Sequence, residues 1–151
     1  MALKINLINN QILYKFSKTH INDLCKFILK IQGVKNTEVS LLFTTDKRIR
    51  ELNKEFRRKD KATDVLSFYE AKNIKKALTV SYLGDVAISV ETARRQAKAY
   101  NQTIIHEIRL YIVHGLLHLL GHRDYTKKEK QSMDSLQEAL LSQYEKKNDS
   151  R

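Results

Sequence analysis

The segment LYIVHGLLHLLGHRD, residues 110–124, contains the longest apolar stretch of the chain, and two histidines interrupt that stretch. Apolar side chains fall on almost every side of a helix built over residues 101–120, so we expect this helix to be central and buried. His114 and His118 are four residues apart. With about 100° and about 1.5 Å per residue, they lie on one face of the helix one turn apart, and both imidazoles can reach one metal ion.

A third ligand can follow directly after this helix. Gly121 ends the helix and lets the backbone turn back, and His122 and Asp124 are the two candidates beyond it. Three protein ligands leave a fourth position for water, which distinguishes catalytic zinc from closed structural zinc. Because a bound metal lowers the pKa of its water towards about 7, we expect a hydrolase.

The residue after the first histidine, Gly115, bears on the substrate. In the zinc peptidase motif H-E-x-x-H this position holds the glutamate general base, so glycine here disfavours peptide cleavage. A phosphodiester substrate needs cations to hold its phosphate instead. Residues 47–61 contain eight Lys or Arg and three acids, most of them expected on a solvated helix face. Arg57 is our candidate catalytic residue, because a guanidinium binds phosphate through two hydrogen bonds.

The composition favours a globular protein that binds nucleic acid. The chain has 151 residues, 42% of them hydrophobic and 30% charged, which predicts a single domain over residues 1–151. Its formal net charge of +11 favours a polyanionic partner, with nucleic acid ahead of an anionic membrane. The chain has one cysteine, Cys25, which we expect in the core. The single cysteine, together with the lack of a signal peptide or membrane span, predicts a cytoplasmic location.

The hydrophobic patterns predict the α+β class, a mixed sheet of about four strands with helices packed on one face and the buried helix carrying the metal ligands. Strands are predicted at residues 3–8, 39–45, 65–69 and 78–90, the last with a bend at 83–85. Helices are predicted at residues 13–31, with a possible break near 17–22, and at 45–56, 91–100, 101–120 and 126–144. Thr126 and Glu129 form a capping box for the last helix, and residues 146–151 should fray.

Three ordered segments resemble one known family, the bacterial YbeY metalloproteins, which are single-strand-specific endoribonucleases also called rRNA maturation factors. The segments are LNKEFRRKDKATDVLSF (52–68), LGDVAIS (83–89) and HGLLHLLGH (114–122). The resemblance covers most of the chain. It implies an α+β fold with a central metal-bearing helix, one zinc ion per chain and Arg57 in the active cleft. It also implies cleavage of single-stranded RNA in 16S rRNA 3′-end processing and ribosome quality control, with rRNA and the ribosome as partners.

One position departs from the family pattern. The family usually has a third histidine six residues after the second, where this chain has Asp124. A carboxylate is an accepted zinc ligand, so we predict His114, His118 and Asp124 as the metal ligands, with His122 as the alternative third ligand. An anionic ligand lowers the net charge of the centre, which makes bound water less acidic and allows another divalent ion to replace zinc.

The residues alone leave several alternatives open. A ribosome- or RNA-binding assembly factor with a structural metal is the main alternative to a nuclease. Weaker alternatives are a metallopeptidase, a hydrolase of small phosphorylated substrates and an iron oxygenase. Thr63 and Asp64 are predicted to form the turn before the strand at 65–69, and Asp85 to support the bend. Ser67 and Asp85 could equally orient the metal ligands.

Overall fold

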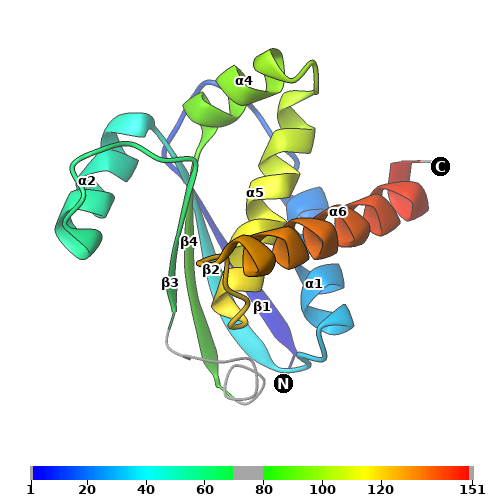
Figure 1. The fold of residues 1–151 in the computed structure, drawn as a ribbon. Coiled ribbons are helices and arrows are strands. Elements are labelled where there is room, and N and C mark those ends of the chain that lie inside the picture. The colour runs from blue at the N-terminus through cyan, green and yellow to red at the C-terminus, as the bar shows by residue number, and fades with distance from the viewer. Residues whose placement is uncertain (1, 70–79, 150–151) are drawn as a thin grey trace.

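The computed structural model describes residues 2–69 and 80–149 and contains a four-stranded sheet (Figure 1). Its strands lie side by side in the order β1 (Leu3–Asn9), β2 (Thr37–Thr44), β4 (Tyr82–Ser89) and β3 (Val65–Tyr69). The pairs β1–β2 and β2–β4 are parallel, whereas β3 and β4 are antiparallel. The sheet is therefore mixed, as predicted, and with the helices it gives an α+β fold.

The helices begin where a side chain can accept hydrogen bonds from the first turn. A Ser or Thr hydroxyl caps α1 (Lys18–Ile31), α2 (Asp46–Arg57), α4 (Val90–Ala99) and α5 (Ile104–Leu119). The predicted capping box is present at the start of α6 (Lys127–Asp149). There the Glu129 N–H donates to Thr126 Oγ1 at 3.1 Å, and the Thr126 N–H donates to Glu129 Oε1 at 3.0 Å.

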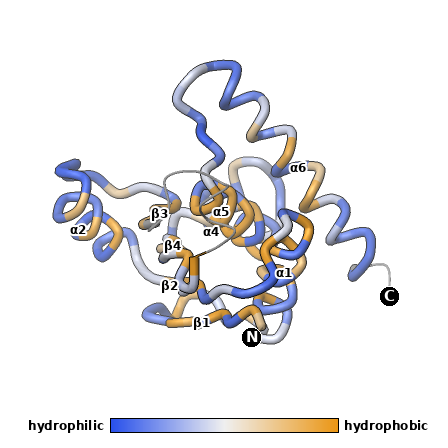
Figure 2. Tube along the Cα trace, turned by 90° about the horizontal axis from the view of Figure 1, so that it is seen from below, coloured by the Kyte–Doolittle hydropathy of each residue, from blue (hydrophilic) through white to orange (hydrophobic). Residues whose placement is uncertain are grey.

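The main core lies between one face of the sheet and helices α1, α5 and α6. Alternate residues of β2 (Val39, Leu41 and Phe43) are fully buried in it, together with residues from these helices. Helix α5 lies in the middle of the molecule and contacts α1, α4, α6, β3 and β4 (Figure 2). The prediction that the helix with His114 and His118 is central and buried is therefore confirmed.

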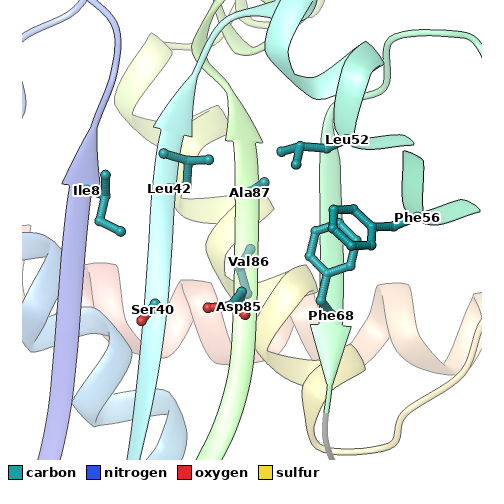
Figure 3. Close-up of a pocket in the computed structure, with 9 residues that line it drawn as sticks. All are labelled: Ile8, Ser40, Leu42, Leu52, Phe56, Phe68, Asp85, Val86 and Ala87. Atoms are coloured by element: carbon teal, nitrogen blue, oxygen red, sulfur yellow. The ribbon is translucent and has the colours of Figure 1, made fainter. Parts of the chain in front are cut away.

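Helix α2 packs on the opposite face of the sheet, so the prediction that the helices share one face is wrong. Ile49 and Leu52 of α2 form a second, smaller core with Leu66 and Ala87. Figure 3 shows this face, where the exposed Phe56 packs edge-on against Phe68 with ring centroids 5.4 Å apart. The amphipathic pattern of α2 indicates that one side is buried, but it does not say against which face of the sheet.

Several element boundaries differ from the prediction. Helix α1 begins only at Lys18, because the Ser17 hydroxyl caps it, and the residues just before it are not helical. Strand β4 begins at Tyr82, while residues 78 and 79 of the predicted strand lie outside the described residues. The predicted bend is a bulge: Glu38 pairs with Tyr82 and Val39 with Gly84, so residue 83 has no direct partner in the β2–β4 ladder.

The last helix continues to Asp149, five residues beyond the predicted end at residue 144. Residues 150 and 151 of the tail expected to fray lie outside the described part of the chain. None of the helices described combines the length and the hydrophobicity needed to cross a bilayer.

Gly115 allows α5 to approach the sheet closely. A Cβ atom at this position would lie 2.5 Å from Val86 Cγ1 and 3.1 Å from Val86 Cγ2. The Ser67 hydroxyl of β3 donates a buried hydrogen bond of 3.1 Å to the Gly115 carbonyl oxygen. Packing therefore favours glycine here, which explains why this position does not hold the glutamate of the zinc peptidase motif.

Replacing Gly115 with alanine should destabilise the fold. Overpacking costs about 1–3 kcal/mol, and the better helix propensity of alanine offsets about 1 kcal/mol of it. We expect urea unfolding of Gly115→Ala to show a loss of about 1 kcal/mol or more. In the double variant with Val86→Ala the added methyl has room, so the loss should be smaller than the sum of the two single losses. Strictly additive losses would contradict the contact.

Candidate metal centre

Two histidines of α5 lie close together in the lining of a cleft. His114 Nε2 and His118 Nε2 are 3.0 Å apart, and the two rings meet edge to face with centroids 4.5 Å apart. Both side chains are about three-quarters buried, with exposed fractions of 24% and 22%. The helical spacing predicted from the sequence thus brings both imidazoles to one point.

The other ring nitrogen of each histidine is held by an oxygen atom. His114 Nδ1 lies 2.9 Å from Gln137 Oε1 on α6, and His118 Nδ1 lies 3.0 Å from the backbone oxygen of His122. A backbone oxygen can only accept, so His118 carries its proton on Nδ1, and the amide oxygen of Gln137 favours the same tautomer in His114. Both Nε2 lone pairs then point into the cleft, as in histidines that bind metals.

Asp124 completes the cluster. Its Oδ2 lies 3.5 Å from His118 Nε2 and 3.8 Å from His114 Nε2. The backbone returns toward α5 because Gly121 adopts a φ of 95°, a left-handed conformation that favours glycine. One ligand atom from each of the three residues lies within 4.8 Å of the others.

The three atoms fit a metal ion. A tetrahedral site with metal–ligand distances of about 2.0–2.1 Å holds its ligand atoms about 3.4 Å apart, and the separations here are 3.0, 3.5 and 3.8 Å. Two imidazole lone pairs this close to each other repel unless a cation or a proton lies between them. Two nitrogens and one carboxylate oxygen suit zinc and harder divalent ions.

His122, the alternative third ligand, lies elsewhere. Its Nε2 is 2.9 Å from Gln32 Oε1 at the end of α1, so its side chain does not join the cluster. Burial lowers the pKa of the His122 imidazole. The residue contributes to the centre through its backbone oxygen, which orients His118.

The neighbours of His118 favour its neutral form. Burial lowers the pKa of the imidazole, and the nearby His114 lowers it further. The Asp124 carboxylate and the His122 carbonyl act in the opposite direction but are weaker. A neutral imidazole is the form that binds a metal ion.

Arg57 lies in the same cleft. At the end of α2, its Nη2 donates a hydrogen bond of 3.0 Å to the backbone oxygen of Ser67. The cleft has a volume of about 250 Å³, and Arg57, Asp64, Ser67, His114, His118, Asp124 and Tyr125 are among the residues that line it. Ser67 therefore connects both sides of the cleft: its carbonyl holds Arg57 and its hydroxyl holds the α5 turn at Gly115.

The structure separates the roles left open for the neighbouring polar residues. Asp64 accepts hydrogen bonds from the Val65 N–H at 2.8 Å and the Thr63 hydroxyl at 3.2 Å, as expected for the turn before β3. Asp85 accepts from the Tyr82 hydroxyl across the bulge and lies on the α2 face of the sheet (Figure 3). Asp85 thus supports the bend and does not touch the histidines.

Gln137 was missed by the sequence reasoning. It lies on α6, 23 residues after His114, and its position on that helix carries no local signal of its contact. Only the packing of α6 against α5 brings its amide to the ring.

The fold and site define a class: α+β proteins whose central helix carries a candidate His-His-Asp metal centre in a cleft that also holds an arginine. Within this class, the chain belongs to the endoribonuclease YbeY family, whose model matches residues 5–145. It is 40% identical over 134 residues to endoribonuclease YbeY of Aquifex aeolicus, covering 87% of each chain.

Two further relatives illustrate the extent of the similarity. Endoribonuclease YbeY of Myxococcus xanthus is 46% identical over 115 residues, which are 76% of this chain but only 38% of that protein. The solution structure of TM1509 from Thermotoga maritima superposes with a TM-score of 0.69 at 23% identity, covering 97% of this chain and 92% of the other. That similarity concerns the fold alone.

The tautomer of His118 is directly measurable. Because its pKa is lowered, His118 should be neutral near pH 7.5, and long-range ¹H–¹⁵N correlation of the metal-free protein should show the proton on Nδ1. His20 is exposed and has no side-chain partner within the described residues, so it should show averaged tautomers. A proton found mainly on Nε2 of His118 would contradict the arrangement.

Proposed function

We propose that this protein is a metal-dependent hydrolase that cleaves single-stranded RNA internally, as an endoribonuclease of rRNA maturation. The observation that supports this most is a single cleft that contains the His-His-Asp cluster and Arg57. Membership of the endoribonuclease YbeY family supports the same activity. A hydrolytic centre beside a guanidinium suits the cleavage of a phosphodiester.

In this proposal, His114 and His118 bind one divalent ion through Nε2, and Asp124 binds it through a carboxylate oxygen. Zinc is the first candidate, and the anionic ligand favours harder ions more than three histidines would. A bound ion supplies a Lewis acid and an acidified water in the cleft. Gln137 and the His122 carbonyl orient the two rings, so that the ligands need little rearrangement on binding.

Arg57 binds the scissile phosphate and stabilises the negative charge that develops during cleavage. Its hydrogen bond to the Ser67 carbonyl uses one Nη2 proton and directs the side chain along the cleft. The remaining guanidinium N–H groups form no other hydrogen bond that involves the described residues, so they are available for phosphate oxygens.

The surface charge favours RNA as the substrate. The chain has a net charge of +11, and eight of its cations lie in residues 47–61, on α2 and the loop after it. Long-range attraction of this kind raises the affinity for any polyanion without selecting a sequence. We further propose that the RNA is the 3′ end of 16S rRNA, and that the protein acts on the ribosome in the cytoplasm.

The identity of the third ligand can be tested by metal binding. Asp124→Ala should weaken zinc binding to the metal-free protein by about 100-fold or more in calorimetry, because losing a group that only orients a ligand already costs about 10- to 100-fold. His122→Ala is the matched control. The His122 side chain bonds Gln32 and not the cluster, and the substitution keeps the His122 backbone oxygen that orients His118. If His122→Ala loses zinc and Asp124→Ala does not, the assignment is wrong.

Catalysis can be tested at Arg57. Arg57→Ala should lower kcat for a single-stranded RNA about 100- to 1,000-fold, as expected for removing one transition-state donor. RNA binding should change little, because the other cations of residues 47–61 remain. Arg58→Ala is the matched control: Arg58 caps α2 in a left-handed conformation and does not line the cleft.

Chelation provides the second readout of the same experiment. With EDTA, cleavage should stop while circular dichroism remains unchanged, since the core around α5 consists of buried apolar side chains and includes none of the three predicted ligands. Unfolding on chelation would show that the metal is structural.

For the substitution at Arg57, full activity of Arg57→Ala would remove this residue from the mechanism.

A further inference from the structure

A second cavity adjoins the metal cleft on the other side of His114. It has a volume of about 260 Å³ and is formed mainly by α4, α5 and α6. Asp64, Val65 and His114 line both cavities, so the His114 ring is part of the wall between them. A ligand held in the metal cleft can therefore extend into the second cavity, which the proposed mechanism does not use.

This second cavity contains two buried polar groups without an evident role. Glu107 is only 7% exposed, and no ion pair of its carboxylate occurs among the described residues. The Tyr111 side chain, also 7% exposed, lines the cavity one turn later, and the polar group that interacts with its buried hydroxyl is the Glu107 carboxyl, at a geometry short of a well-formed hydrogen bond. Burial raises the pKa of both groups. Buried polar groups of this kind usually require a partner.

An aromatic ring stands at the edge of the same cavity. Tyr100 follows the last turn of α4 and is 70% exposed, although it is a large hydrophobic residue. Exposed aromatic rings beside a cleft are the usual platforms on which proteins stack unpaired nucleobases. Gln96, one turn earlier on α4, adds an amide to the rim.

The two cavities differ in the cation that each offers. Arg57 lines the metal cleft and forms no ion pair among the described residues, whereas Lys130, in the second cavity, pairs with Asp134 at 3.5 Å beside the Glu107 carboxyl. A phosphate is therefore favoured in the first cavity and disfavoured in the second. A neutral base with hydrogen-bond donors suits the second.

We propose that the second cavity binds the nucleobase next to the scissile phosphate, and that it selects bases with an exocyclic amino group over uracil. This rests on the proposed function, since it places the phosphate of the same RNA in the metal cleft. Tyr100 stacks on the base, and the Glu107 carboxyl accepts a hydrogen bond from the amino group in either protonation state. Uracil has a carbonyl where cytosine has the amino group, so it offers Glu107 no such donor.

Cytidine and uridine monophosphates provide a matched pair of probes, because the two pyrimidines differ only on one edge: cytosine has an amino group and a bare N3, and uracil has a carbonyl and an N3–H. We expect NMR titration of the zinc-loaded protein to show CMP binding about tenfold more tightly than UMP, which is the usual effect of one hydrogen bond to a charged group. Backbone amide signals of Tyr100, Glu107 and Tyr111 should shift on binding. Equal affinities, or shifts confined to other regions, would overturn the proposal.

Substitutions at Glu107 and Tyr100 separate recognition from folding. Glu107→Leu should abolish the preference for CMP, while Glu107→Gln keeps an acceptor and should retain a preference. Tyr100→Ala, at an exposed position, should weaken both nucleotides about fivefold or more, and Tyr100→Phe should not. A preference that survives Glu107→Leu, or unchanged binding by Tyr100→Ala, would contradict the assignment.

These measurements do not depend on cleavage. If the protein binds CMP selectively but cleaves no RNA with either base at the flanking position, the proposed endoribonuclease activity fails and the nucleobase site does not. If it cleaves RNA with cytosine and uracil at that position equally well and binds both nucleotides equally, the nucleobase site fails and the endoribonuclease proposal stands.

Discussion

The close contact between α5 and the antiparallel pair β3–β4 determines where every group of the candidate site lies. Gly115 has no side chain, so the helix backbone packs directly on Val86, and the Ser67 hydroxyl joins the helix carbonyl to β3. That contact sets the rotation of α5 and hence the direction of His114 and His118. Through the Ser67 carbonyl it also sets the position of Arg57, which comes from a helix on the other face of the sheet. A shift of the helix would displace the metal ligands and the arginine together.

The side chains of the site are oriented for a cation. Gln137 and the His122 carbonyl hold the two Nδ1 atoms, which leaves the Nε2 lone pairs 3.0 Å apart and facing Asp124. This arrangement is unfavourable without a positive charge and becomes favourable with one. The cleft therefore combines a place for a cation with a guanidinium, and a cavity lined by Glu107 and Asp134 lies across the His114 ring. This arrangement can orient a nucleotide with its phosphate toward Arg57.

Much of the fold follows from local patterns. The first two predicted strands and the capping box at Thr126 depend on residues that are neighbours in the chain, and the structure confirms them. The side of the sheet that α2 covers was predicted wrongly. An amphipathic helix can cover either face of a sheet, and the choice depends on contacts between Leu52, Leu66 and Ala87, which are far apart in the sequence.

The same distinction applies to the site. The proximity of His114 and His118 is a property of the α-helix, and Gly121 marks where the chain can turn, so both are readable from the order of residues. Whether the His122 or the Asp124 side chain returns to the histidines depends on side-chain directions after the turn, which Gln32 of α1 and the packing of α5 decide. The contacts of Gln137 with His114 and of Arg57 with Ser67 likewise join separate elements. The spacing of residues along one helix determines which of its own side chains lie together. Which side chains from different elements meet is determined only when the elements pack.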